Sequence, residues 1–116
     1  MSTVSPEALD RLWSELWVSL ASLLRSYTAL HGLSGNRQAT VEVDDGRILA
    51  SHGGRWLKLT RTGAAILWEQ SGGGRGELEM TETGRLRGGS GEEEMDMAAE
   101  TWARDLMREL TRELEQ

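Results

Sequence analysis

The chain of 116 residues is the size of one domain and is long enough to bury roughly two thirds of its unfolded surface. It has no cysteine, which excludes disulfides, thiolate metal sites and cysteine nucleophiles. Its net charge of -6 arises in residues 92–116, where nine acids accompany three arginines, so we do not expect a nucleic acid as the partner.

Targeting and membrane-spanning patterns are not found in the sequence. The first ten residues, "MSTVSPEALD", contain no basic region followed by an apolar run, and the longest apolar run is "AAILW". We therefore expect a soluble protein without a signal peptide or a membrane span, and the lack of disulfides suits the cytoplasm.

The first predicted element is one long amphipathic helix over residues 6–31, after a disordered start at residues 1–5. Ser5 is the expected N-cap, Pro6 the first helical residue and Gly32 the residue that ends the helix. Apolar residues recur at alternating spacings of four and three: Leu9, Trp13, Leu16, Leu20, Leu23, Tyr27 and Leu30. Such a stripe is typical either of a dimeric coiled coil or of a helix that packs on a sheet. Additional apolar residues widen the stripe and favour the sheet: Leu12, Trp17 and Leu24.

Residues 39–88 have the period-two pattern of an antiparallel meander with five or six short strands. The expected strands contain "ATVEV", "RILAS", "RWLKLT", "ELEMT" and "RLR", and Asp45-Gly46 is a strong hairpin signal. The segment "TGAAILWEQ" is compatible with a strand or with a short helix capped by Thr62, because a compact apolar run does not determine its own period.

A second amphipathic helix is predicted over residues 91–115. Ser90 and Glu93 have the spacing of a capping box, and the glutamates of "SGEEEMDM" suit the positive end of a helix dipole. The same acids form no EF-hand calcium loop. The apolar face of this helix contains Met95, Ala99, Trp102, Leu106 and Leu110, flanked by Ala98, Met107 and Leu114.

These elements predict a single α+β domain over residues 1–116, a two-layer sandwich with both helices on one face of the sheet. The order of elements resembles the layout of the frataxins, and "WEQSGGGRGELEM" is similar to the tryptophan strand and glycine turn of that family. The resemblance implies iron binding by an acidic ridge on the first helix and first strand. The first helix offers only Glu7, Asp10 and Glu15, so we expect no metal and no cofactor.

The glycine-rich segment "SGGGRG" can be interpreted as a phosphate loop or as a turn. A phosphate loop needs a lysine and a hydroxyl after its last glycine, and neither is present. We therefore predict a hairpin turn in which glycine supplies positive φ, with Arg75 as a candidate anion contact.

The two histidines do not suggest a catalytic or metal site. His31 is expected at the negative end of the first helix, and His52 in a turn. A site could form only if Asp44 or Asp45 converged with His52 across the first hairpin. We expect structural roles for both histidines, and we predict no catalytic residues.

The predicted open face of the sheet carries the candidate binding residues. Trp56 and Lys58 share one side of their strand, and Trp68 joins them if Leu67 points inward. The full candidate set is Trp56, Lys58, Trp68, Arg75, Arg85 and Arg87. Aromatic residues among bases are also found on sheets that stack nucleobases, but the RNP signatures are missing.

We accordingly predict a small non-enzymatic interaction module, homodimeric or bound to another protein through the open sheet face or the first helix. Two alternatives remain open from the sequence: a small-ligand or metal-binding domain, and an enzyme that uses carboxylates and His52.

Overall fold

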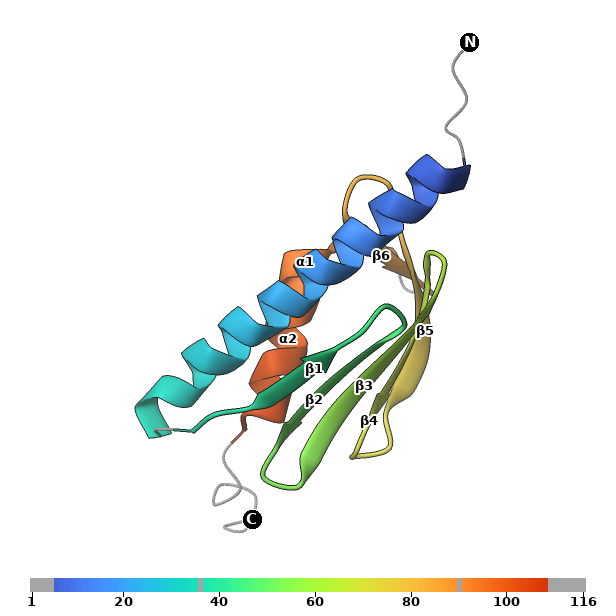
Figure 1. Cartoon of the computed structure of the whole chain (residues 1–116). Coiled ribbons are helices and arrows are strands. Elements are labelled where there is room, and N and C mark those ends of the chain that lie inside the picture. Colours follow the sequence, from blue (N-terminus) through green and yellow to red (C-terminus); the bar gives the residue numbers. More distant parts are fainter. Residues whose placement is uncertain (1–5, 36, 90, 109–116) are drawn as a thin grey trace.

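A computed structural model of the chain describes residues 6–35, 37–89 and 91–108 (Figure 1). The elements in chain order are α1 (Pro6–Gly32), a short 3-10 helix η1 (Leu33–Gly35), β1 (Thr40–Val43), β2 (Arg47–His52), β3 (Arg55–Thr62), β4 (Ala65–Gln70), β5 (Arg75–Met80), β6 (Arg85–Gly88), β7 (Gly91–Glu94) and α2 (Met95–Leu106). The α+β layout of helix, antiparallel sheet and helix is confirmed. The sheet has seven strands rather than the predicted five or six.

The sheet is a plain meander in which each strand pairs only with its neighbours in the sequence. The predicted Asp45-Gly46 hairpin is confirmed, because the Asp44 carboxylate accepts a hydrogen bond of 3.0 Å from the Gly46 amide, and the Asp44 amide donates to the Arg47 carbonyl at 2.9 Å. The ambiguous apolar run is strand β4, preceded by a turn at Gly63 with φ of 60°. Positive φ is accessible to glycine without steric cost, which lets the chain reverse there instead of starting a helix.

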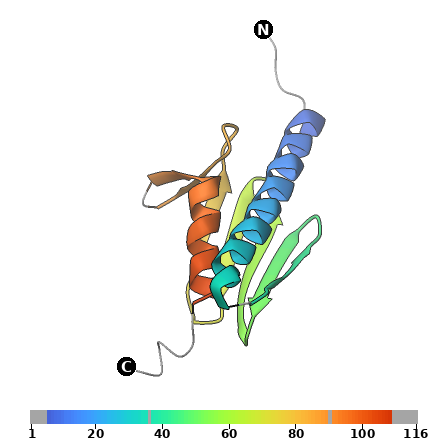
Figure 2. The same ribbon diagram turned by 90° about the vertical axis from the view of Figure 1, so that its left-hand side faces the viewer.

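Both helices cover the same face of the sheet, and Figure 2 shows them side by side in front of it. The buried strand residues alternate along the chain: Ile48, Ala50, Leu57, Leu59, Ile66, Met80 and Leu86. The helices bury Trp17, Leu20, Ala21, Leu24, Ala98, Ala99, Trp102 and Leu106 against them. The broad stripe of α1 therefore packs inside the chain, as its width predicts.

The start of the second helix was predicted wrongly. Residues 91–94 form strand β7, and α2 begins at Met95 with Glu94 as its N-cap. Two local features favour the strand. Gly91 has φ of 125°, which suits the end of a tight turn, and Glu94 lies opposite Arg85 of β6 in an ion pair of 3.8 Å. Cross-strand charge pairing therefore replaces the expected helix start.

The end of the second helix also differs from the prediction, because α2 ends at Leu106. Several expectations fall outside the described residues: the caps at Ser5 and Ser90, the disorder predicted for residues 1–5 and the helix predicted over residues 109–115. In the part of the chain that is described, no helix combines the length and the apolar character needed to cross a membrane.

Candidate interaction face and neighbouring cleft

The open face of the sheet carries two rows of outward side chains that run across the strands. The Lys58 row consists of Glu42, Leu49, Lys58, Glu69 and Arg75, one residue from each of β1 to β5. The Leu67 row consists of Arg47, Thr60, Leu67 and Glu77, one residue from each of β2 to β5. The two rows are adjacent, because their members are two residues apart on each shared strand.

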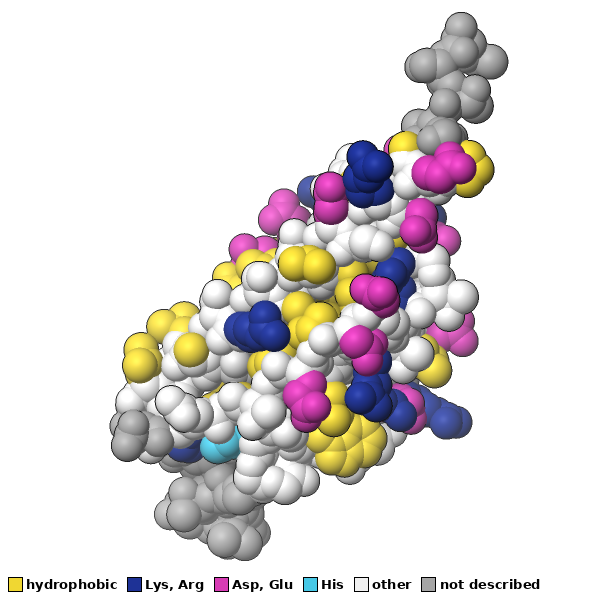
Figure 3. Space-filling model, in the orientation of Figure 1, with side chains coloured by type: hydrophobic (Ala, Val, Ile, Leu, Met, Phe, Trp, Pro, Cys, Tyr) yellow, Lys and Arg dark blue, Asp and Glu magenta, His cyan; other side chains and the backbone are white. Residues whose placement is uncertain are grey.

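Charges of both signs are interspersed on this face. Lys58 forms an ion pair of 3.4 Å with Glu69, and Arg87 of β6 pairs with Glu79 of β5. In the space-filling view, basic and acidic side chains mix with hydrophobic ones over the region of the strands (Figure 3). Because these pairs are exposed, each contributes little to stability. The face is electrostatically patterned without being uniformly basic or acidic.

Two large apolar side chains lie exposed among these charges. Trp56 is 38% exposed and Leu67 is 43% exposed. Leu67 belongs to the Leu67 row, and Trp56 lies next to Lys58 on the outward side of β3. Single apolar residues are normal on a protein surface, but these two are large and lie on a sheet face that neither helix covers, which makes this face the candidate contact surface.

Trp68 does not join the open face, because Leu67 points outward and the condition for that placement is not met. The Trp68 ring contacts the Trp102 ring of α2, with centroids 6.3 Å apart, on the helix side of the sheet. A Cβ added to Gly76 would lie 2.8 Å from Nε1 of Trp68. The glycine therefore leaves room for an indole that lies across β5, which is a packing role for part of the glycine-rich segment.

The remaining candidate residues lie on the open face, but they are spread over it. Arg75 is the first residue of β5 and is exposed, and Arg85 and Arg87 lie on β6. Arg85 and Arg87 are held by the acidic residues of the neighbouring strands, Glu94 and Glu79. The pairing with Glu79 raises the pKa of Arg87 above its ordinary value. Arg85 and Arg87 are therefore each paired with an acidic residue of the chain.

The structure separates His52 from Asp44 and Asp45, the residues that the sequence offered for a metal or catalytic site. His52 ends β2 at the edge opposite the Asp44–Asp45 turn, and its Nδ1 lies 3.3 Å from the carbonyl oxygen of Gln38. The other residues of β2 stand between the histidine and the two aspartates. Within the described residues, no group of three or more histidine and carboxylate side chains is close enough to hold a metal ion.

A polar ladder between the helices was missed by the sequence analysis. The Tyr27 hydroxyl donates to the Asp96 carboxylate, and His31 Nε2 lies 2.9 Å from the Glu100 carboxylate. The hydrogen bond to Asp96 raises the pKa of Tyr27. Hydrogen bonds from Arg104 and then from His31 lower the pKa of Glu100. Because each interhelical pair is separated by 69 residues, no local motif could indicate it; the two pairs show that α1 and α2 run in the same direction.

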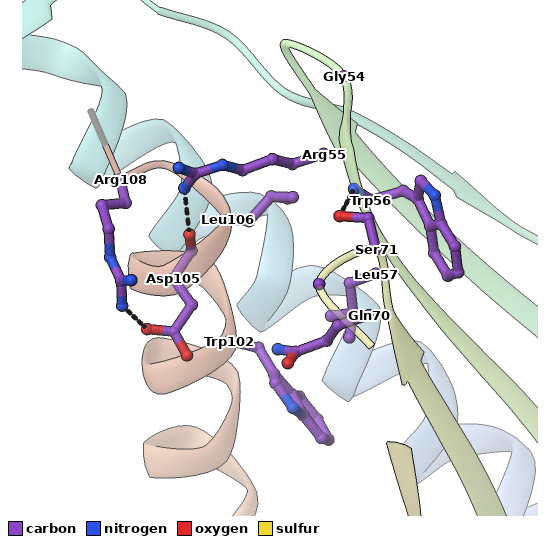
Figure 4. A pocket seen from close by; sticks show the side chains of 11 residues that line it. Gly54, Arg55, Trp56, Leu57, Gln70, Ser71, Trp102, Asp105, Leu106 and Arg108 are labelled. Atoms are coloured by element: carbon purple, nitrogen blue, oxygen red, sulfur yellow. Dashed lines mark hydrogen bonds and ion pairs between the residues drawn. The ribbon is translucent and has the colours of Figure 1, made fainter. Parts of the chain in front are cut away.

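A cleft of about 430 Å³ lies on the helix side of the sheet, between the end of α2 and the neighbouring strand ends (Figure 4). Trp102 and Gln70 face each other across it. Arg55 donates a hydrogen bond of 3.1 Å to the Asp105 carbonyl, and the Asp105 carboxylate accepts one of 2.9 Å from Arg108. The Trp56 side chain points away from the cleft (Figure 4), so the cleft and the open face are separate surfaces.

No family model, curated protein or solved structure matches this chain. The frataxin-like order of elements therefore assigns no family. The chemistry of the two surfaces has to be inferred from their own residues.

Proposed function

We propose that the protein is a small non-enzymatic interaction module of the cytoplasm that binds a protein partner through the open face of its sheet. The observation that carries the proposal is the exposure of Trp56 and Leu67 on a face that neither helix covers. Trp56 and Leu67 lie on either side of the Lys58–Glu69 ion pair, and this mixture of large apolar and charged side chains is the composition of a protein contact surface.

We prefer the open face over α1 as the contact surface because the apolar stripe of α1 is buried within the chain. The stripe of α1 buries Trp17, Leu20 and Leu24 inside the chain, so these residues are not available to a coiled-coil partner. On the sheet, by contrast, the apolar residues have no intramolecular layer above them among the described elements.

Photo-crosslinking tests this proposal at a single residue. We would replace Leu67 with a photoreactive amino acid and irradiate living cells that express the protein. We expect crosslinked protein adducts of defined mass from position 67. The control is the same replacement at Val18, which is 59% exposed on α1 and lies away from the sheet face. Adducts at neither position, or equal adducts at both positions, would contradict a contact surface on the sheet.

The cleft supports a second candidate function, the binding of a small ligand. Its volume of about 430 Å³ is within the range of small-molecule sites, and it combines an indole with amide and guanidinium groups. Native mass spectrometry of the purified protein tests this alternative. Retained mass that is lost from the Gln70→Leu variant would favour the ligand function, and bare protein from both preparations would count against it.

A further inference from the structure

The two ends of the Leu67 row carry opposite charges that no described residue pairs. Arg47 on β2 and Glu77 on β5 are both exposed. Among the described residues, neither side chain forms an ion pair or a side-chain hydrogen bond, in contrast to Lys58 and Glu69 of the adjacent row. The two charges stand three strands apart, about 14 Å at the usual strand spacing, and so cannot reach each other within one chain.

We propose that the partner on the open face is a second copy of this chain, stacked face to face about a two-fold axis; the proposal rests on the function proposed above. The axis runs parallel to the strands and lies between β3 and β4. Under this operation, β3 of one copy lies over β4 of the other, and β2 lies over β5. Each row is then placed over the same row of the second copy in reversed order.

The reversed order places one pair of opposite charges over each other in each row. In the Leu67 row, Arg47 lies over Glu77 of the second copy. In the Lys58 row, Lys58 lies over Glu69 of the second copy. The Lys58–Glu69 ion pair of one copy then faces the same ion pair of the other, so that each charge has an opposite charge beside it and another across the contact. Each contact occurs twice by symmetry, which gives four intermolecular ion pairs from two kinds of contact.

The uncharged positions are also compatible with this stacking. Leu67 lies over Thr60 of the second copy, and Leu49 lies over the aliphatic stem of Arg75. Stacked sheets are rotated by about 30°, which displaces a residue about 7 Å from the axis by only about 4 Å. Arginine and glutamate side chains can span such a displacement. The contacts therefore survive the normal twist.

The alternative two-fold axis, perpendicular to the strands, gives a poorer match. Under this operation each strand lies over the same strand of the second copy, and the Leu67 row lies over the Lys58 row. Only Glu77 then meets an opposite charge, on Arg75, while Leu67 lies over Glu69 and Arg47 lies over Leu49. Charge complementarity thus selects the axis parallel to the strands.

The size of the contact sets the affinity that we expect. Strands β2 to β5 cover about 19 Å by 20 Å, or about 400 Å² of projected surface per copy. The two copies together bury about 800 Å², which is below the roughly 1,200 Å² of stable interfaces, so we expect a weak dimer with a dissociation constant in the micromolar range. Sedimentation equilibrium at protein concentrations up to about 0.5 mM covers this range.

Charge reversal tests the proposed pairing directly. Either Arg47→Glu or Glu77→Arg places like charges over each other and should weaken dimerisation at least about tenfold. The double variant Arg47→Glu/Glu77→Arg restores opposite charges and should dimerise within about threefold of the parent protein. An equimolar mixture of the two single variants should form heterodimers, because each copy then supplies the charge that the other lacks.

The controls change the net charge by the same amounts at a distance from the sheet. Arg11→Glu and Glu15→Arg lie on exposed positions of α1 and should leave the dissociation constant within about twofold. Circular dichroism and thermal melting verify that every variant is folded. Controls that weaken the dimer as strongly as the sheet variants, or a double variant that stays monomeric, would overturn the two-fold stack.

The crosslinking experiment distinguishes the failure of this inference from the failure of the proposed function. A parent protein that is monomeric at about 0.5 mM, with position 67 crosslinked to a different protein, rejects the second copy and retains the interaction module. The absence of any adduct at position 67 rejects both. An adduct of twice the chain's mass, together with restoration by the double variant, supports both.

Discussion

The two faces of the sheet are built from the same strands but meet different physical demands. On β3, Leu57 and Leu59 point toward the helices and are at most 1% exposed, whereas Lys58 between them points outward. The inner face must fill space against α1 and α2, so shape and apolar surface determine its residues. On the outer face, charged side chains form ion pairs with each other, and Trp56 and Leu67 stay exposed. The comparison indicates that the fold depends on one face, and that the other is available for recognition.

Two tryptophans on neighbouring strands show the same division in one residue type. Trp68 packs against Trp102 and is accommodated by Gly76, so its position depends on tight contacts. Trp56 is 38% exposed and contacts no ring of α2 among the described residues. The inner indole is part of the core, whereas the outer indole is free to contact another molecule.

Substitution of adjacent residues on β3 should separate the two faces most strongly. Leu59→Ala removes a fully buried side chain and should lower the free energy of unfolding by about 2–5 kcal/mol. Lys58→Ala removes one exposed ion pair and should cost less than about 1 kcal/mol. Urea unfolding measures both values. If both variants lowered the free energy of unfolding by similar amounts, Leu59 and Lys58 would not lie on a buried and an exposed face.

The inner face should also be sensitive where the backbone, rather than a side chain, makes room. Gly76→Ala forces a methyl group to 2.8 Å from Trp68 and should cost about 1–3 kcal/mol. Gly72→Ala is the matched control, because nothing lies within 4 Å of a Cβ at that position. Thermal unfolding compares the two. A stable Gly76→Ala protein would mean that Trp68 can move away without loss of packing.

The sequence was sufficient to predict which face of each strand and helix is buried, because burial imposes a period on the apolar residues of each element. Alternation at Leu57 and Leu59 predicts the strand and its inner face, and the broad stripe around Trp17 predicts a helix that lies on a sheet. Both signals are local. They are averaged over several residues, so a single unusual position does not obscure them.

The missed features depend on partners that are distant in the sequence. Glu92 and Glu94 form a strand because Arg87 and Arg85 lie opposite, which a capping-box pattern cannot reveal. Trp68 points inward because Ile66 shares its side of β4, and the run "AAILW" allowed either phase. The cleft combines residues of β3, β4 and α2, so it becomes visible only once the chain is folded.

Substitutions on the outer face should weaken dimerisation more than they lower the free energy of unfolding. Trp56→Ala should lower the free energy of unfolding by only about 1 kcal/mol, because the side chain is partly exposed on a strand surface. The same change should weaken dimerisation. Met97→Ala, at a residue 59% exposed on α2, is the matched control and should leave dimerisation unchanged. Sedimentation measures the association of both variants, and an unaffected Trp56→Ala dimer would place the contact elsewhere.

The smallest effect is expected at the polar ladder that holds the helices over the inner face. The pKa of Glu100 is lowered by hydrogen bonds from Arg104 and His31, so the folded state binds its proton less readily than the unfolded state. The stabilisation is therefore complete above the unfolded pKa of about 4.3 and is lost as the pH falls through the lowered value. Glu100→Gln should reduce the melting temperature slightly at neutral pH, and the difference should vanish in acid. The exposed turn residue Glu82, changed to Gln, should show no such pH-dependent difference. A constant offset for Glu100→Gln at every pH would instead assign the loss to packing.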